Sequence, residues 1–119
     1  MKIIRKFLGA IIVFIDKITR PKPMKRSEED QRKIDEQTKG LSLYQFHACP
    51  FCVKVRRVIH RLNLKIELRD VQKNQQFEKE LIEGGGKRKV PCLRLQENGS
   101  VRWMYESNNI ISNLEKKFS

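Results

Sequence analysis

The stretch that decides the fold is LSLYQFHACPFCVKVRRVIHRL, residues 41–62. Its first six residues alternate and are rich in strand-forming side chains, so they predict a β-strand over 41–46. Apolar residues then recur at positions 52, 55, 58, 59 and 62, a helical period that predicts a helix over 52–62. Cys49 and Cys52 therefore form a C-x-x-C motif where a strand meets a helix, and this placement indicates redox chemistry or a metal.

Downstream of this stretch the pattern is that of an α/β domain. We expect a short strand over 65–68, a helix over 74–83 ended by three glycines, a strand over 92–96, a hairpin turn over 97–100, a strand over 101–105 and a helix over 107–117. The predicted order over residues 41–119 is β-α-β-α-β-β-α, without an internal repeat.

Upstream, residues 1–20 predict an amphipathic helix with a wide apolar face. The unbroken apolar run, Phe7 to Ile15, is shorter than the roughly 20 residues that span a bilayer. The start is basic, as in a signal peptide, but no small-x-small cleavage site follows. We favour an uncleaved helix on an anionic membrane surface; a helix docked on the domain or on a partner is the alternative. Nine large side chains make up the apolar face: Ile3, Ile4, Phe7, Leu8, Ile11, Ile12, Phe14, Ile15 and Ile18.

Residues 21–40 read as a charged linker. Pro21 and Pro23 end the first helix, and only Met24 and Ile34 are apolar among the residues that follow them. The Ser-Glu-Glu-Asp run at 27–30 could cap a short solvated helix. We therefore expect a flexible or weakly helical segment between the first helix and the domain.

The charge of the chain limits the partners that it can bind. The net charge is +12, with 11 basic and 6 acidic side chains in residues 1–40 and 15 and 8 in residues 41–119. A positive charge spread over the whole chain favours acidic proteins, anionic lipid or a small dianionic thiol, although it also serves solubility. No nucleic-acid reader motif accompanies the charge, so we expect no nucleic-acid binding.

The C-x-x-C motif carries the chemistry. Cys49 falls near the helix N-terminus, where unpaired N–H groups and the positive end of the helix dipole stabilise a thiolate. Cys52 lies one turn further and can reach back, so Cys49 is the expected nucleophile and Cys52 the resolving thiol. A zinc site remains an alternative, because Cys92 and His47 could complete four ligands. Cys92 otherwise reads as a small buried apolar residue.

Two further elements could bind a substrate. Val90-Pro91 opens a strand after a glycine-rich loop, a natural place for a cis bond, although an ordinary trans proline also fits. Ser107 is expected to cap the last helix, whose N-terminus can receive a carboxylate.

On these motifs, residues 41–117 resemble the glutaredoxin family and the N-terminal thioredoxin-fold domain of glutathione transferases. The resemblance implies a four-stranded mixed sheet and a site that binds glutathione. In those families the first cysteine attacks disulfides, the Val-Pro backbone pairs with the cysteinyl part of glutathione, and the N-terminus of the last helix holds the γ-glutamyl carboxylate. Lys87, Arg88 and Lys89 are candidates for the glycyl carboxylate, and Phe51 replaces the usual tyrosine. The implied site residues are Cys49, Cys52, Phe51, Lys89, Val90, Pro91, Glu106 and Ser107.

The resemblance implies a glutathione-dependent thiol–disulfide oxidoreductase that reduces protein or glutathione mixed disulfides. Glutathione would be the co-substrate, disulfide-containing proteins the partners, and no metal is expected. The alternative is a membrane-tethered binding module that holds an iron–sulfur cluster or glutathione without turnover. The basic residues after position 20 and the need for reduced glutathione predict a cytoplasmic location, with attachment to the cytoplasmic face of a membrane.

Overall fold

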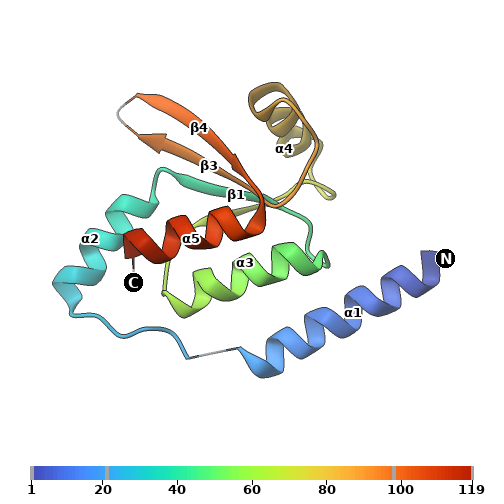
Figure 1. Cartoon of the computed structure of the whole chain (residues 1–119), viewed down its shortest axis with the longest axis horizontal. Coiled ribbons are helices and arrows are strands. Elements are labelled where there is room, and N and C mark those ends of the chain that lie inside the picture. Colours follow the sequence, from blue (N-terminus) through green and yellow to red (C-terminus); the bar gives the residue numbers. More distant parts are fainter. Residues whose placement is uncertain (1, 21, 98, 119) are drawn as a thin grey trace.

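The strand and the helix predicted around the two cysteines form the centre of the structure, a computed structural model that describes residues 2–20, 22–97 and 99–118 (Figure 1). The order of elements is helix-helix-β-α-β-α-β-β-α. Their bounds are α1 Lys2–Thr19, α2 Glu28–Thr38, β1 Leu41–Gln45, α3 Pro50–Arg61, β2 Glu67–Asp70, α4 Gln75–Glu80, η1 Leu81–Gly85, β3 Cys92–Glu97, β4 Ser100–Tyr105 and α5 Ser107–Phe118.

The four strands make one mixed sheet in the order β2-β1-β3-β4. β1 is parallel to β2 and antiparallel to β3, and β3 is antiparallel to β4. The predicted thioredoxin-like arrangement is confirmed. The register places Cys92 opposite Tyr44 on one side and Tyr105 on the other. The chain segments that leave β1, enter β3 and leave β4 therefore meet at one end of the sheet.

Alternation along the strands divides the core between the two faces of the sheet. Leu43, Leu93 and Leu95 pack with apolar residues of α3 and α5, and Figure 1 shows these two helices side by side on that face. Tyr44 and Cys92 belong to the other cluster, which includes Leu81 of η1. Cys92 is fully buried there, as expected for a small apolar residue.

The predicted helix over 74–83 is a six-residue α4 followed by the π-helical turn η1. Two of its glycines permit close packing and do not end the helix. A Cβ at Gly84 would lie 2.2 Å from the Trp103 ring, and one at Gly85 would lie 2.2 Å from the Tyr105 hydroxyl oxygen. The third, Gly86, has φ +90° and ends the turn in the left-handed conformation.

The expected linker is folded against the domain. Ser27 caps α2 by accepting a hydrogen bond from the Asp30 N–H at 3.2 Å, as the sequence indicated. Met24 and Ile34 pack on the core. The Arg26 guanidinium donates to the Leu62 carbonyl at 2.6 Å and to the Phe118 carbonyl. Of the two expected forms, flexible or weakly helical, the structure has the helical one over Glu28–Thr38. Its side chains also find distant partners on the domain, which a local pattern does not show.

Helix α1 lies alongside α3 (Figure 1). Most of its apolar face is exposed. The contacts with the domain come from the polar side, where Gly9 and Asp16 are buried. Eight of the nine apolar side chains predicted on the other face are exposed: Ile3, Ile4, Phe7, Leu8, Ile11, Phe14, Ile15 and Ile18. Within the described part of the chain, no helix combines the length and hydrophobicity that a bilayer crossing requires.

Candidate active site at the start of helix α3

Cys49 occupies the N-cap position of α3, with extended backbone angles of φ −75° and ψ 125°. Pro50 is the first helical residue, where a missing N–H costs nothing. The Cys49 carbonyl accepts the first helical bond, from the Val53 N–H at 2.9 Å. Cys49 is partly exposed and Cys52 is fully buried. A disulfide substrate can therefore approach Cys49, while Cys52 is shielded one turn inside the helix.

The environment of Cys52 keeps that residue protonated. Burial, supplemented by the neighbouring Cys49, raises the pKa of Cys52 to about 12, against a weaker opposing effect of the Phe46 amide. That amide donates to the Cys52 sulfur at an N···S distance of 3.4 Å. The two cysteines are therefore unequal: Cys49 is accessible at the helix N-terminus, and Cys52 is a buried thiol behind it.

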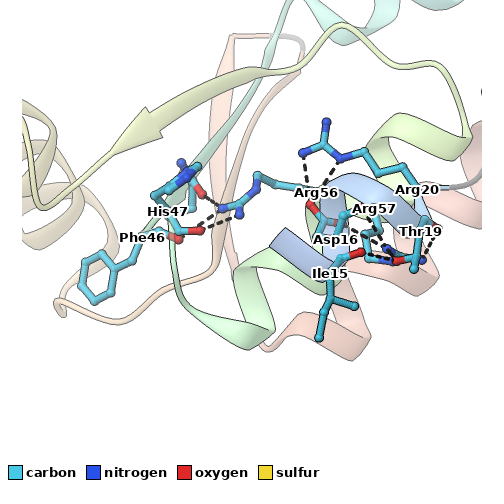
Figure 2. Close-up of polar contacts among 9 residues, drawn as sticks. Ile15, Asp16, Thr19, Arg20, Phe46, His47, Arg56 and Arg57 are labelled. Carbon is cyan, nitrogen blue, oxygen red and sulfur yellow. Dashed lines mark hydrogen bonds and ion pairs between the residues drawn. The ribbon is translucent and has the colours of Figure 1, made fainter. Parts of the chain in front are cut away.

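Arg56 of α3 fixes the loop that carries Cys49 (Figure 2). Its guanidinium donates to the Phe46 carbonyl at 3.2 Å, to the His47 carbonyl at 2.5 Å and to the side-chain oxygen of Gln45. The side chain is buried. The role of Arg56 in holding this loop could not be predicted from the sequence, because a helical period does not show which loop carbonyls need a donor.

His47 does not supply a cation to the site. Its side chain is exposed. Its pKa is lowered from 6.5, chiefly by desolvation and by the charge of Arg56. The imidazole is therefore neutral near pH 7 and adds no positive charge beside Cys49.

Val90-Pro91 and the start of α5 form the second part of the site. The Val90-Pro91 bond is cis. The Lys89 ammonium lies 2.6 Å from the Glu106 carboxylate, and this pair lowers the pKa of Glu106. Glu106 has φ +71°, a left-handed conformation that residues with a Cβ rarely adopt. Ser107 is the first residue of α5, so the N-cap position belongs to Glu106 and not to Ser107.

The three cations that precede the proline have different neighbours. The Lys87 ammonium lies 4.7 Å from the centre of the Tyr105 ring. Arg88 stacks over Phe46 and pairs with Glu78 at 3.4 Å. Lys89 alone contacts a residue of the α5 start. The order β2-β1-β3-β4 brings Lys87, Arg88 and Lys89 to the same end of the sheet as the cysteines. Phe51, the remaining predicted site residue, is exposed on α3.

A cavity of about 490 Å³ opens beside Cys49. The active-site loop contributes Phe46, Ala48 and Pro50 to its lining, and helix α1 contributes Arg5, Leu8 and Ile12. Sequence patterns do not predict this second wall, because residues 1–20 carry no motif that points to the cysteines. Among the described residues, no group of three or more His, Cys, Asp or Glu side chains is placed to bind a metal ion, so the zinc alternative has no ligand set there.

Comparison with known proteins identifies the family of the domain. The family model called Glutaredoxin matches residues 41–99. The chain is also 37% identical over 75 residues to prostaglandin E synthase 2 of Mus musculus, an alignment that covers 63% of this chain and 19% of that protein. The chain thus spans about a fifth of the length of this curated relative.

Solved structures agree with this match. Glutathione transferase E6 of Drosophila melanogaster superposes with a TM-score of 0.52 at 27% identity, covering 66% of this chain and 35% of that one. A maleylacetoacetate isomerase of Anaeromyxobacter dehalogenans 2CP-1, with bound GSH in its active site, gives 0.51 at 25% identity, covering 66% and 37%. A wheat glutaredoxin gives 0.51 at 21% identity, covering 77% and 87%, and shows the shared fold. The chain therefore contains a domain of the glutaredoxin family.

Proposed function

We propose that this protein is a glutathione-dependent thiol–disulfide oxidoreductase. One observation carries the proposal: Cys49 is accessible at the N-terminus of α3, with the buried Cys52 thiol, whose pKa is about 12, directly behind it. An exposed thiolate exchanges rapidly with disulfides, and a shielded second thiol stays reduced until a mixed disulfide forms next to it.

The exchange proceeds in balanced two-electron steps. The Cys49 thiolate attacks one sulfur of a substrate disulfide, and the other sulfur leaves as a thiolate. Cys52 loses its proton and attacks the Cys49 sulfur, which releases the reduced substrate and forms the Cys49–Cys52 disulfide. One glutathione thiolate opens this disulfide, and a second removes the first as glutathione disulfide. A glutathione mixed disulfide can also be reduced by Cys49 and glutathione alone.

The arrangement around Glu106 supports binding of glutathione. A tripeptide with an ammonium group and two carboxylates needs both signs of charge, and Lys89 and Glu106 supply them 2.6 Å apart. The start of α5, with Ser107, offers unpaired N–H groups for a carboxylate. Val90 and Pro91 contribute the adjacent backbone, and Phe51 supplies an exposed ring next to Cys49. In this proposal glutathione replaces the Lys89–Glu106 pair with one contact to each side chain.

A kinetic comparison tests the activity. We expect the reduced protein to turn over the mixed disulfide of glutathione and 2-mercaptoethanol in the presence of glutathione, glutathione reductase and NADPH. Cys49→Ser should abolish turnover. Cys52→Ser should keep it but lose direct reduction of protein disulfides. Full activity in Cys49→Ser would overturn the proposal.

The cellular location is part of the same proposal: the cytoplasmic face of a membrane, with α1 on anionic lipid. Eight large apolar side chains stay exposed on α1, and exposed cations flank them, among them Lys6 and Lys17. Apolar burial and attraction to anionic headgroups, about 1 kcal/mol per cation, both favour such a surface. The cytoplasm is also where reduced glutathione is available.

Flotation with liposomes tests this location. The full chain should float with vesicles that contain phosphatidylglycerol at low salt, and the double variant Phe7→Ser/Phe14→Ser should not. Phe51→Ser is the matched control, because Phe51 is 62% exposed and Phe7 66%, but Phe51 lies on α3. Failure of the full chain to float would overturn the proposal, as would a stable dimer that covers the α1 face in sedimentation.

A further inference from the structure

The cavity beside Cys49 is largely separate from the proposed glutathione site. It is lined by Cys49 but by none of the other residues assigned above to glutathione, which are Phe51, Lys89, Val90, Pro91, Glu106 and Ser107. A substrate that is joined to Cys49 through its sulfur can therefore extend into this cavity while glutathione residues stay free. The cavity holds about 490 Å³, room for several side chains of a polypeptide.

Helix α1 is held firmly enough to act as a wall. Asp16 is 3% exposed. Its carboxylate accepts from Arg57 of α3 at 3.1 Å and from Arg20 at 3.0 and 3.2 Å. Arg57 also donates to the carbonyl of Thr19 at 3.1 Å, which satisfies the C-terminal turn of α1 (Figure 2). A carboxylate with two guanidinium partners and almost no solvent keeps its position much better than an exposed pair.

The walls of the cavity define what they can bind. Leu8 and Ile12 from α1 and Phe46 and Pro50 from the loop are apolar. Arg5 brings a positive charge and makes no ion pair with any residue that the structure describes. Such a surface fits an apolar side chain together with a carboxylate.

We propose that this cavity binds the polypeptide part of a protein disulfide substrate, and that α1 is its specificity element. The substrate cysteine has an apolar neighbour, which packs on Leu8 and Ile12, and an acidic residue nearby, which pairs with Arg5. The proposal rests on the reductase function and adds the class of substrate. The chemistry is the exchange already described, in which the Cys49 sulfur joins the substrate sulfur and the second substrate sulfur leaves as a thiolate.

Two peptides test the proposal with the full-length reduced protein. Each holds two cysteines in an intramolecular disulfide with leucine beside the first, and they differ only by glutamate or lysine at one further position. Rates of peptide reduction are measured by chromatography at low salt. The wild type should prefer the glutamate peptide by about 3- to 5-fold, the size of one favourable ion pair. Arg5→Glu should reverse this preference.

The apolar wall has its own variants. Leu8→Ser/Ile12→Ser should lower kcat/KM for both peptides by about 10-fold, the usual effect of losing a packed apolar contact in a binding pocket. Ile18→Ser is the matched control, because Ile18 is exposed on α1 but does not line the cavity. A wild type that reduces both peptides equally, or an unchanged preference in Arg5→Glu, would overturn the inference. If the wild type also fails to turn over the small glutathione mixed disulfide, the reductase function itself fails.

Discussion

Gly9 of α1 lies against Ala48 of the active-site loop so closely that a Cβ at position 9 would come 2.8 Å from the Ala48 Cβ. The contact sets the distance between the N-terminal helix and the residue before Cys49. A glycine inside a helix costs about 1 kcal/mol relative to alanine. This close approach is the structural reason for having one at this position.

Gly9→Leu should therefore separate α1 from the domain. The added side chain has no room beside Ala48, and overpacking of this kind costs about 1–3 kcal/mol. Amide hydrogens of residues 2–19 should exchange faster than in the wild type, as measured by mass spectrometry. Ala10→Leu is the control, since Ala10 is exposed one residue further along α1. Equal protection in the two variants would show that the Gly9–Ala48 contact does not hold the helix.

The buried thiols should make the protein less stable at alkaline pH. Burial raises the pKa of Cys52 to about 12 and that of Cys92 to about 11. The native state thus keeps protons that the unfolded chain loses near pH 9. The contribution of the two protonated thiols to the free energy of unfolding is therefore complete below about pH 9 and declines as the pH rises toward 11.

Urea unfolding of the reduced protein between pH 7.5 and about 10.5 measures this decline. The fall in the free energy of unfolding should be smaller in Cys52→Ala and in Cys92→Ala than in the wild type. Cys49→Ala, which removes the accessible thiol and keeps both buried ones, should retain most of it. Parallel curves for all four proteins would contradict the assignment.

Glu106 should lower the stability of the fold through its backbone conformation while contributing to glutathione binding. Its φ of +71° is unfavourable for any residue with a Cβ, by about 1–2 kcal/mol. Glu106→Gly should therefore unfold at a higher temperature than Glu106→Ala, although both lack the bond to Lys89. Both should show a raised KM for glutathione. A Glu106→Gly protein no more stable than Glu106→Ala would show that the turn relaxes without strain.

Arg26 should be needed for the stability of the domain. It donates to carbonyls at the ends of α3 and α5, Leu62 and Phe118, which lack helical partners. Arg26→Ala should lower the free energy of unfolding by about 1.5–3 kcal/mol, the cost of losing charged hydrogen bonds. Lys25→Ala, at an exposed neighbouring position, should change it little. We accordingly expect the free energy of unfolding to be much lower in a chain lacking residues 1–40 than in one lacking residues 1–20. Equal values for the two chains would place the domain boundary at Leu41.

Local patterns were sufficient for the strands and for the position of Cys49 and Cys52 at the start of α3. Strand alternation placed Leu43 and Tyr44 on opposite faces, and the helical period placed Cys52 inside α3, because both follow from backbone geometry alone. The element boundaries shifted where long-range contacts decided them. β2 begins at Glu67, two residues later than expected, in register with β1.

The remaining features depend on partners far along the chain. The polar composition of residues 21–40 hid the helix that packs through Met24 and Ile34. Asp16 is buried against Arg57, 41 residues further along the chain, a contact that no local pattern predicts. Neighbouring residues Arg56 and Arg57 serve different segments, the active-site loop and α1, and no period in the sequence distinguishes them.

Because Cys92 is fully buried, it should stay a free thiol in both the oxidised and the reduced protein. Neither oxidant nor reductant in solvent reaches this thiol unless the sheet opens. Redox titration should therefore follow one Nernst curve for a two-electron couple, about 30 mV per tenfold change in ratio. After denaturation, the reduced chain should yield all three thiols to a colorimetric reagent. The oxidised chain should yield only one, so the thiol count of any preparation reports directly what fraction of it carries the closed Cys49–Cys52 bond.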